Sequence, residues 1–163
     1  MGGFKNRSLN LNLKQELYEQ LCEFIIKCSE LMVSNFTAKG SKIVNDEIKI
    51  TAHFTENYLN NFSVRKSVCN NNLPFKFIYE SPENFANATN TYGGRLDIRA
   101  ASLNYFSCEN NDDYYSIECK RIDGSSNLNK KYVTQGVVRF VVPPIKYQSF
   151  HNKNIMFGYS CFY

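Results

Sequence analysis

The sequence predicts a single α/β domain in which helices flank a mixed β-sheet. Three observations lead to this prediction: an apolar helical repeat near the N-terminus, three strand-like segments in succession, and a helical pattern before a last apolar strand. A helix between two strands is typical of a crossover connection, which makes those strands parallel. The length of 163 residues suits one domain. We expect residues 1–163 to fold together, with 45–163 as the core and 1–44 as a helical extension.

Two helices are expected before the strands. Residues Leu13–Ser34 carry apolar side chains at helical spacing over several turns, and Gly40 interrupts the pattern. The second helix should begin at Asn45 or Asp46 and run to about Asn61. Both residue types are good N-caps, and acidic residues in a first turn interact favourably with the helix dipole.

Three strands, a third helix and a last strand follow. The three strands are Phe75–Tyr79, Arg95–Ala101 and Tyr114–Ile122, all rich in aromatic or β-branched residues. A turn at 110–113 should make the last two antiparallel neighbours. Lys130–Val142 shows helical spacing and should end at Pro143-Pro144. The apolar segment Ile155–Tyr163 then completes a mixed sheet with helices on its faces.

The composition is that of a folded and mildly basic protein. Apolar residues make up 43% of the chain and aromatic residues 15%, which excludes a disordered chain. The net charge of +4 is compatible with a polyanionic partner without specifying one. No apolar run reaches the length of a membrane span, and no charged-then-apolar leader is present. The six cysteines also lack CxxC or zinc-site spacing. Together these observations lead us to expect a reduced, cytoplasmic protein without a membrane partner.

A glutamate and a lysine inside the third strand are the strongest candidates for chemistry. Glu118 and Lys120 are two residues apart, so they share one face of a strand. Ile117 and Cys119 then face the other way, with Cys119 as a small buried residue. Charged residues are disfavoured in strands, so this pair calls for a reason. The spacing alone says little, because Glu47-Ile48-Lys49 repeats it in a helix, where residues two apart do not meet.

A second acid strengthens the case for Glu118. Asp97 lies within the preceding strand, and a hairpin would place it beside Glu118 on the same face. Two carboxylates, with main-chain and water oxygens, form a site suited to Mg²⁺ or Mn²⁺. The sequence therefore predicts a metal site at Asp97 and Glu118, with Lys120 next to it. The alternative is an exposed strand face with a cross-strand ion pair.

This arrangement resembles the PD-(D/E)XK nuclease superfamily, whose restriction-endonuclease-like core runs helix, three strands, helix, strand. The resemblance covers residues 45–163, about three-quarters of the chain. The family signature is an acid on the second strand and Glu/Asp-x-Lys on the third. Asp97, Glu118 and Lys120 stand at these positions. The proline that precedes the acid in the signature is replaced by Leu96.

The resemblance implies a metal-dependent nuclease that hydrolyses phosphodiester bonds, with DNA as the favoured substrate. Asp97 and Glu118 would hold Mg²⁺ or Mn²⁺, and Lys120 would orient or deprotonate the attacking water or stabilise developing charge. Glu47 matches an acid often found on the helix before the strands, and Gln135 a polar residue on the helix after the third strand. The expected phosphate contacts are Arg95, Arg99, Arg121, Lys130, Lys131 and Arg139.

Structural or surface roles, without a part in catalysis, are also possible for several of these residues. Glu47 fits equally well as an acid that meets the helix dipole, and Gln135 as a solvated helix position. The remaining polar candidates fit as loop, structural or surface residues: Asp112, Asp113, His53 and His151.

Two other functional classes are compatible with the sequence. One is a nuclease-like domain that binds nucleic acid or a protein without cutting, and the other is an oligomeric structural protein. Carboxylates close enough to share one ion favour the enzyme. Carboxylates on opposite sheet faces, or a basic residue at the ion position, favour the binding module. Because one site cuts one strand, a nuclease of this size is expected to act as a homodimer or in a larger complex.

Overall fold

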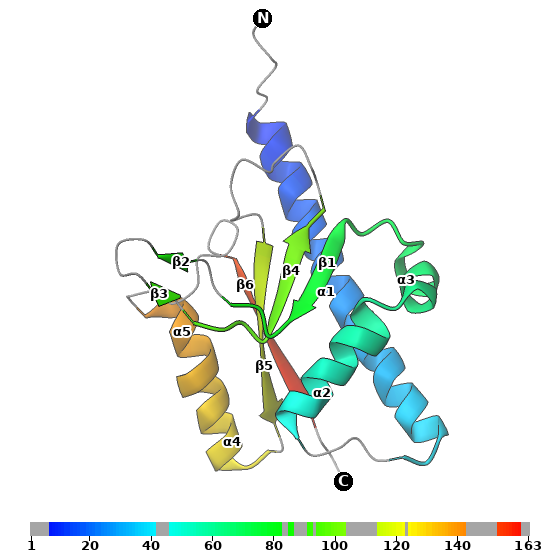
Figure 1. Cartoon of the computed structure of the whole chain (residues 1–163), viewed down its shortest axis with the longest axis vertical. Helices are drawn as coiled ribbons and strands as arrows, with labels where there is room; N and C mark the ends of the chain where they lie inside the picture. The colour runs from blue at the N-terminus through cyan, green and yellow to red at the C-terminus, as the bar shows by residue number, and fades with distance from the viewer. Residues whose placement is uncertain are drawn as a thin grey trace, which may run out of the picture.

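The protein is described by a computed structural model that covers residues 7–41, 46–82, 85–86, 91–92, 94–103, 114–122, 124–142 and 153–160. The helical segments are α1 (Arg7–Ala38), α2 (Glu47–Phe54), η1 (Thr55–Leu59), α3 (Phe62–Cys69), α4 (Ser126–Lys131), η3 (Tyr132–Val137) and α5 (Val138–Val141). The strands are β1 (Phe75–Tyr79), β2 (Phe85–Ala86), β3 (Thr91–Tyr92), β4 (Ile98–Ser102), β5 (Tyr114–Ile122) and β6 (Asn154–Ser160). Figure 1 shows a central sheet with helices on both sides. The predicted mixed α/β class is confirmed.

Four strands form a mixed sheet in the order β1-β4-β5-β6. β4 is antiparallel to both β1 and β5, whereas β5 and β6 are parallel. The parallel pair is possible because the helical segment α4–η3–α5 lies between β5 and β6 in the chain and makes the crossover. β2 and β3 form a separate two-stranded sheet. The antiparallel β4–β5 pair and the crossover before β6 agree with the sequence prediction.

One face of the sheet carries the main hydrophobic core. Phe24 of α1 stacks on Phe77 of β1, with ring centroids 5.8 Å apart. Phe54 of α2 stacks on Phe157 of β6 at 5.2 Å. Among the side chains of α1 that the structure describes, five are buried in this core: Leu21, Phe24, Ile25, Cys28 and Met32. The N-terminal helix, expected as an extension, therefore packs directly on the core.

The opposite face of the sheet lies under α4, η3 and α5 (Figure 1). Gly136 of η3 is buried there, and a Cβ atom at this position would collide with Met156 of β6. The missing side chain lets the helix lie close to the sheet. Leu96 and Tyr114 are buried on this side, and Phe140 of α5 packs against them. This face therefore combines a small apolar cluster with the charged residues of β5.

Some element boundaries differ from the prediction. The helix expected at Lys130 already begins at Ser126, because the Ser125 side chain accepts a hydrogen bond from the backbone of Leu128 at 3.3 Å. β4 begins at Ile98, later than the predicted start of this strand. β1 and β5 have the predicted bounds. The predicted turn at 110–113, the Pro143-Pro144 stop and the chain end at 161–163 lie outside the described residues.

α3 has no counterpart in the sequence prediction. Its N-cap Asn61 accepts a hydrogen bond from Val64 N at 3.1 Å, so the helix has a clear local start signal. Its eight residues are too short for a recognisable apolar repeat. The buried Arg65 holds it in place by donating to the carbonyls of Leu59 and Leu73 at 3.0 and 2.6 Å.

Within the described part of the chain, no helix is both long and apolar enough to cross a membrane.

Candidate active site

β5 brings Glu118 and Lys120 to the face of the sheet that lies under η3. Their neighbours Ile117 and Cys119 point into the core on the opposite face, as the two-residue period of a strand requires. The Glu118 side chain is only 1% exposed and that of Lys120 12%, and Glu118 Oε1 lies 3.0 Å from Lys120 Nζ. This placement agrees with the one expected from their spacing.

The charged part of β5 extends beyond the end of its neighbour β4. β4 begins at Ile98, whereas β5 continues along the sheet with backbone N–H groups that have no β4 partner. Asp97 Oδ2 accepts a hydrogen bond from the backbone N–H of Cys119 at 2.8 Å. Glu47 Oε2 accepts one from the N–H of Arg121 at 3.0 Å. These two carboxylates thus accept hydrogen bonds from β5 N–H groups that β4 does not reach. The same hydrogen bonds hold both carboxylates in place.

The ammonium group of Lys120 joins three carboxylates. Besides Glu118, its Nζ lies 3.2 Å from Glu47 Oε1 and 3.5 Å from Asp97 Oδ2. Burial alone would lower the pKa of Lys120, but the negative charges of Asp97, Glu118 and Glu47 outweigh it and raise the pKa above its usual value. Lys120 therefore carries its positive charge at neutral pH.

Glu47 reaches Lys120 because α2 begins at this residue. The side chain of Asp46 caps the helix by accepting hydrogen bonds from Ile48 N and Lys49 N at 3.0 and 3.2 Å. This cap agrees with the start predicted at Asn45 or Asp46. Glu47 therefore occupies the first turn, where it meets the helix dipole, and also contacts Lys120. Its two proposed roles are compatible.

Arg139 of α5 is a partner of Glu118 that the sequence did not indicate. Its Nη1 lies 2.6 Å from Glu118 Oε1. The sequence suggested a phosphate contact for Arg139, whereas the structure places it against a buried carboxylate. The available signal was Gly136, about one helical turn earlier, which brings this helix close to the sheet. We refer to Glu47, Asp97, Glu118, Lys120 and Arg139 as the Lys120 cluster.

The two oxygens of Glu118 have different surroundings. Both cations contact Oε1, while Oε2 is buried without a hydrogen-bond partner among the described residues. Burial raises the pKa of Glu118, the charge of Asp97 adds to this, and Lys120 and Arg139 act in the opposite direction. A buried carboxylate oxygen without a partner is costly and calls for an explanation.

The donor set of the cluster fits a hard divalent cation. Glu118 Oε2 offers a buried ligand atom that the described protein groups leave unused. Asp97 places a second carboxylate next to the same lysine ammonium. Mg²⁺ and Mn²⁺ prefer such oxygens, and Mg²⁺ commonly uses one or two carboxylates and keeps several waters. In the described ranges, no group of three or more His, Cys, Asp or Glu side chains is arranged as a metal site. The two proposed ligands remain Asp97 and Glu118, the residues that the sequence suggested.

Gln135 does not join the cluster. It is exposed on η3 and makes no hydrogen bond to any residue that the structure describes. Lys130 and Lys131 are likewise exposed, at the C-terminal end of α4. These lysines could meet a polyanion from solution, whereas Gln135 fits the solvated role that the sequence also allowed.

The other predicted phosphate contacts have protein partners. Arg95 forms an ion pair with Glu80 at 3.1 Å, and the Arg99 guanidinium lies 4.1 Å from the ring centroid of Tyr114. Arg121 is half-buried next to Lys120 in β5, and its backbone binds Glu47. Each of these three arginines therefore has an interaction within the protein.

His53 does not contribute to the candidate site. His53 packs between the rings of Phe36 and Tyr58, with centroids 5.5 and 5.7 Å away, which agrees with a structural role. The remaining polar candidates lie outside the described residues: Asp112, Asp113 and His151.

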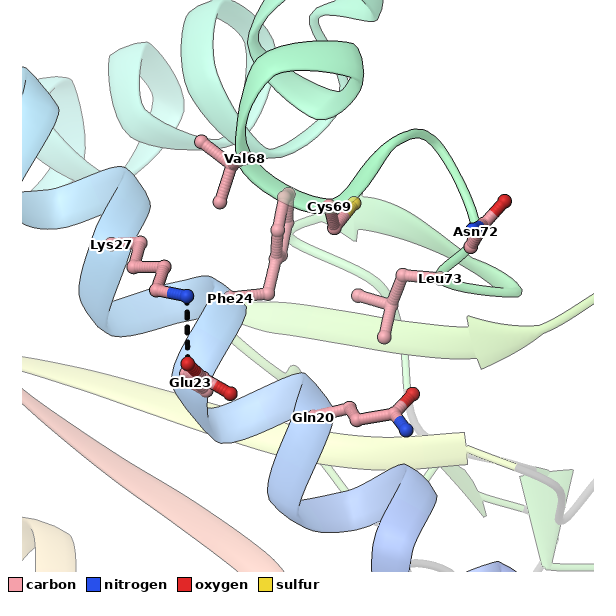
Figure 2. Close-up of a pocket in the computed structure, with 8 residues that line it drawn as sticks. All are labelled: Gln20, Glu23, Phe24, Lys27, Val68, Cys69, Asn72 and Leu73. Atoms are coloured by element: carbon pink, nitrogen blue, oxygen red, sulfur yellow. Dashed lines mark ion pairs between the residues drawn. The ribbon is translucent and has the colours of Figure 1, made fainter.

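A pocket lies elsewhere, between α1 and the α3–β1 segment (Figure 2). It is lined by Gln20, Glu23, Phe24, Lys27, Val68, Cys69, Asn72 and Leu73. An ion pair of 2.7 Å joins Glu23 and Lys27 along α1, on one side of the pocket. Phe24 and Leu73 belong to the core on the other face of the sheet from Glu118. This pocket is therefore separate from the Lys120 cluster.

Comparison of the chain with protein-family models, with curated proteins and with solved structures found no match.

Proposed function

We propose that this protein is a metal-dependent nuclease that hydrolyses phosphodiester bonds, with DNA as the favoured substrate. The observation that carries the proposal is the meeting of Asp97 and Glu118 at Lys120 Nζ, at 3.5 and 3.0 Å. Both carboxylates thus lie on the same side of the sheet, which favours the enzyme over a binding module. Clusters of buried, mutually perturbing charges are common at functional sites.

The order of elements supports a restriction-endonuclease-like fold as the finer description. That fold runs helix, three strands, helix, strand. α2, β1, β4, β5, the segment α4–η3–α5 and β6 follow the same order, with α3 and the β2–β3 pair as additions. The carboxylate and lysine pair on β5 is then the Glu-x-Lys element of the PD-(D/E)XK pattern.

Hydrolysis of a phosphodiester requires an activated water and stabilisation of charge on the phosphate. Mg²⁺ or Mn²⁺ held by Asp97 and Glu118 would supply Lewis acidity and a water of lowered pKa. Lys120 would donate hydrogen bonds to a phosphate oxygen or to the attacking water. Glu47 is a positioning residue, because its contact of 3.2 Å fixes the Lys120 ammonium.

Substrate would approach where the cluster is open to solvent. The Glu47 and Asp97 side chains are 39% and 33% exposed, in contrast to the buried Glu118. The exposed Lys130 and Lys131 of α4 would add sequence-independent contacts to the phosphate backbone. Cleavage of both strands of a duplex would require a dimer or a larger complex.

The direct test is cleavage of DNA by the purified protein. Plasmid should be nicked or degraded with Mg²⁺ or Mn²⁺, and EDTA should abolish this. Lys120→Ala and Glu118→Ala should each reduce the rate by about 10²-fold or more, because each removes a group that acts on the transition state.

The matched control for this assay is Lys76→Ala. Lys76 is exposed on β1, on the same sheet face as Glu118, and lies two strands away. The Lys76→Ala variant should cleave DNA like the wild type. Circular dichroism should show that the Lys120 and Glu118 variants are folded, so that a loss of cleavage reflects the site. Robust cleavage by both variants would contradict the proposal.

A nuclease-like module that binds nucleic acid without cutting is the second candidate. The contact of 2.6 Å between Arg139 Nη1 and Glu118 Oε1 favours it, because a cation already neutralises the carboxylate that would hold the ion. This candidate predicts DNA binding that does not depend on Mg²⁺, together with no cleavage. A gel-shift assay with and without EDTA, run beside the cleavage assay, separates the two.

A further inference from the structure

Arg139 and Glu118 form an unequal pair. Their contact is short, with Nη1 and Oε1 2.6 Å apart. The Arg139 side chain is 33% exposed, whereas that of Glu118 is 1% exposed. A long, partly exposed arginine can turn toward solvent, but a buried glutamate on a central strand cannot. If the pair separates, Arg139 is therefore the partner that moves.

The charges of the Lys120 cluster suggest that Arg139 leaves Glu118 when a divalent ion binds. Three carboxylates face two cations, Lys120 and Arg139. A divalent ion at Glu118 would leave the cluster with excess positive charge next to Arg139, and like charges at this distance repel. Departure of Arg139 would leave the carboxylates balanced by Lys120 and the ion. Lys120 cannot take this role, because Glu47 and Asp97 also hold it.

We propose that Arg139 is a stand-in cation, which holds the Glu118 carboxylate before metal binds and is displaced by the divalent ion. This inference rests on the proposed function for the location of the ion. It assigns Arg139 a specific role, because its removal should strengthen metal binding and weaken the metal-free fold. An arginine that only stabilised the helix would not affect metal affinity in this direction.

The test is a titration of the purified full chain with Mn²⁺, followed by calorimetry and by the EPR signal of free Mn²⁺. Arg139→Met keeps the aliphatic bulk and removes the charge. It should bind Mn²⁺ roughly tenfold or more tightly than the wild type, the size typical of a coupling between two binding events. Its melting temperature without metal should be lower, and the rise on adding Mn²⁺ should be larger.

Lys76→Met is the control for the loss of one positive charge. Lys76 lies on the same sheet face, two strands from Glu118, and its variant should bind Mn²⁺ like the wild type. Equal or weaker Mn²⁺ affinity in Arg139→Met would overturn the inference. An affinity gain of the same size in Lys76→Met would do so too, since it would reflect net charge alone.

The wild type provides a second measurement, in case Arg139→Met does not fold without metal. In ¹⁵N-labelled protein, the Arg139 side-chain signals should shift and broaden as Mg²⁺ saturates the site, because the guanidinium leaves Glu118. Unchanged signals at saturating Mg²⁺, or no metal binding at all, would overturn the inference. Metal binding with release of Arg139 but no DNA cleavage would contradict the proposed nuclease and leave this inference intact.

Discussion

At the scale of single residues, Glu118 is the most unusual feature of the chain. Its carboxylate is buried in a central strand, two cations share one of its oxygens, and the other has no partner among the described residues. A structural ion pair would be expected to satisfy both oxygens. The unsatisfied oxygen is the feature that leads us to propose Glu118 as a metal ligand.

Replacement of Glu118 tests this directly. Burial and the charge of Asp97 raise the pKa of Glu118 above the ordinary value of 4.5. The glutamate therefore contributes stability that is fully present below pH 4.5 and is lost as the pH rises through the folded-state pKa. Without metal, we expect Glu118→Gln to melt roughly 2–4 °C higher than the wild type at neutral pH. The difference should vanish below pH 4.5, which thermal denaturation at several pH values will show.

Glu56→Gln is the control for this measurement. Glu56 is exposed on η1 and has no ion pair in the described part of the chain, so its variant should follow the wild type at every pH. A Glu118→Gln variant that is less stable than the wild type at neutral pH would mean that the ion pairs outweigh the cost of burial.

At the scale of elements, the site depends on how closely η3 lies on the sheet. Gly136 allows this approach, because a side chain there would meet Met156 of β6 and come within 3.6 Å of Lys120 Cγ. The approach in turn carries Arg139 to Glu118. A change at Gly136 is thus expected to affect the charged cluster through the position of the helix.

A double-mutant cycle at Gly136 and Met156 measures this packing. In the wild type, Gly136→Ala gains helix propensity but forces the Met156 side chain to move. In a Met156→Ala background the new methyl group has space, so Gly136→Ala should be stabilising there by about 1 kcal/mol. Urea denaturation should show a coupling of about 0.5 kcal/mol or more between the two positions. Additive effects would mean that the helix does not approach β6 here.

Local sequence signals predicted most elements correctly. Enrichment in aromatic and β-branched residues predicted the observed bounds of β1 and β5, and the Asp46 cap marked the start of α2. α3 was missed because it is short and is held by the buried Arg65. The Arg139–Glu118 contact was missed because it joins residues 21 positions apart on different elements, and no local pattern encodes their distance.

At the scale of the whole molecule, α1 is part of the core. Phe24 is 2% exposed and stacks on Phe77, whereas Ile26 on the same helix is 53% exposed. Because α1 covers one face of the sheet, it also supports β5 from the side opposite the Lys120 cluster. The helix α1 therefore contributes to the stability of the segment that resembles the nuclease core.

Two substitutions in α1 test this contribution. Phe24→Ala should lower the free energy of unfolding by about 3–5 kcal/mol, because it removes a large buried ring. Ile26→Ala, two residues away and exposed, should change it by less than about 0.5 kcal/mol. Urea denaturation followed by circular dichroism provides both values. Similar effects of the two substitutions would mean that α1 does not pack on the sheet as described.

The sequence by itself determined the class of fold, the order of its main elements and the face of β5 that carries Glu118 and Lys120. These features follow from local periodicity, caps and the two-residue period of strands. Only the tertiary structure decided that β4 begins as late as Ile98, that Asp97 and Glu47 bind the exposed edge of β5, and that Arg139 contacts Glu118. Such contacts depend on the distances between elements, which packing of the whole chain sets and which no local pattern contains.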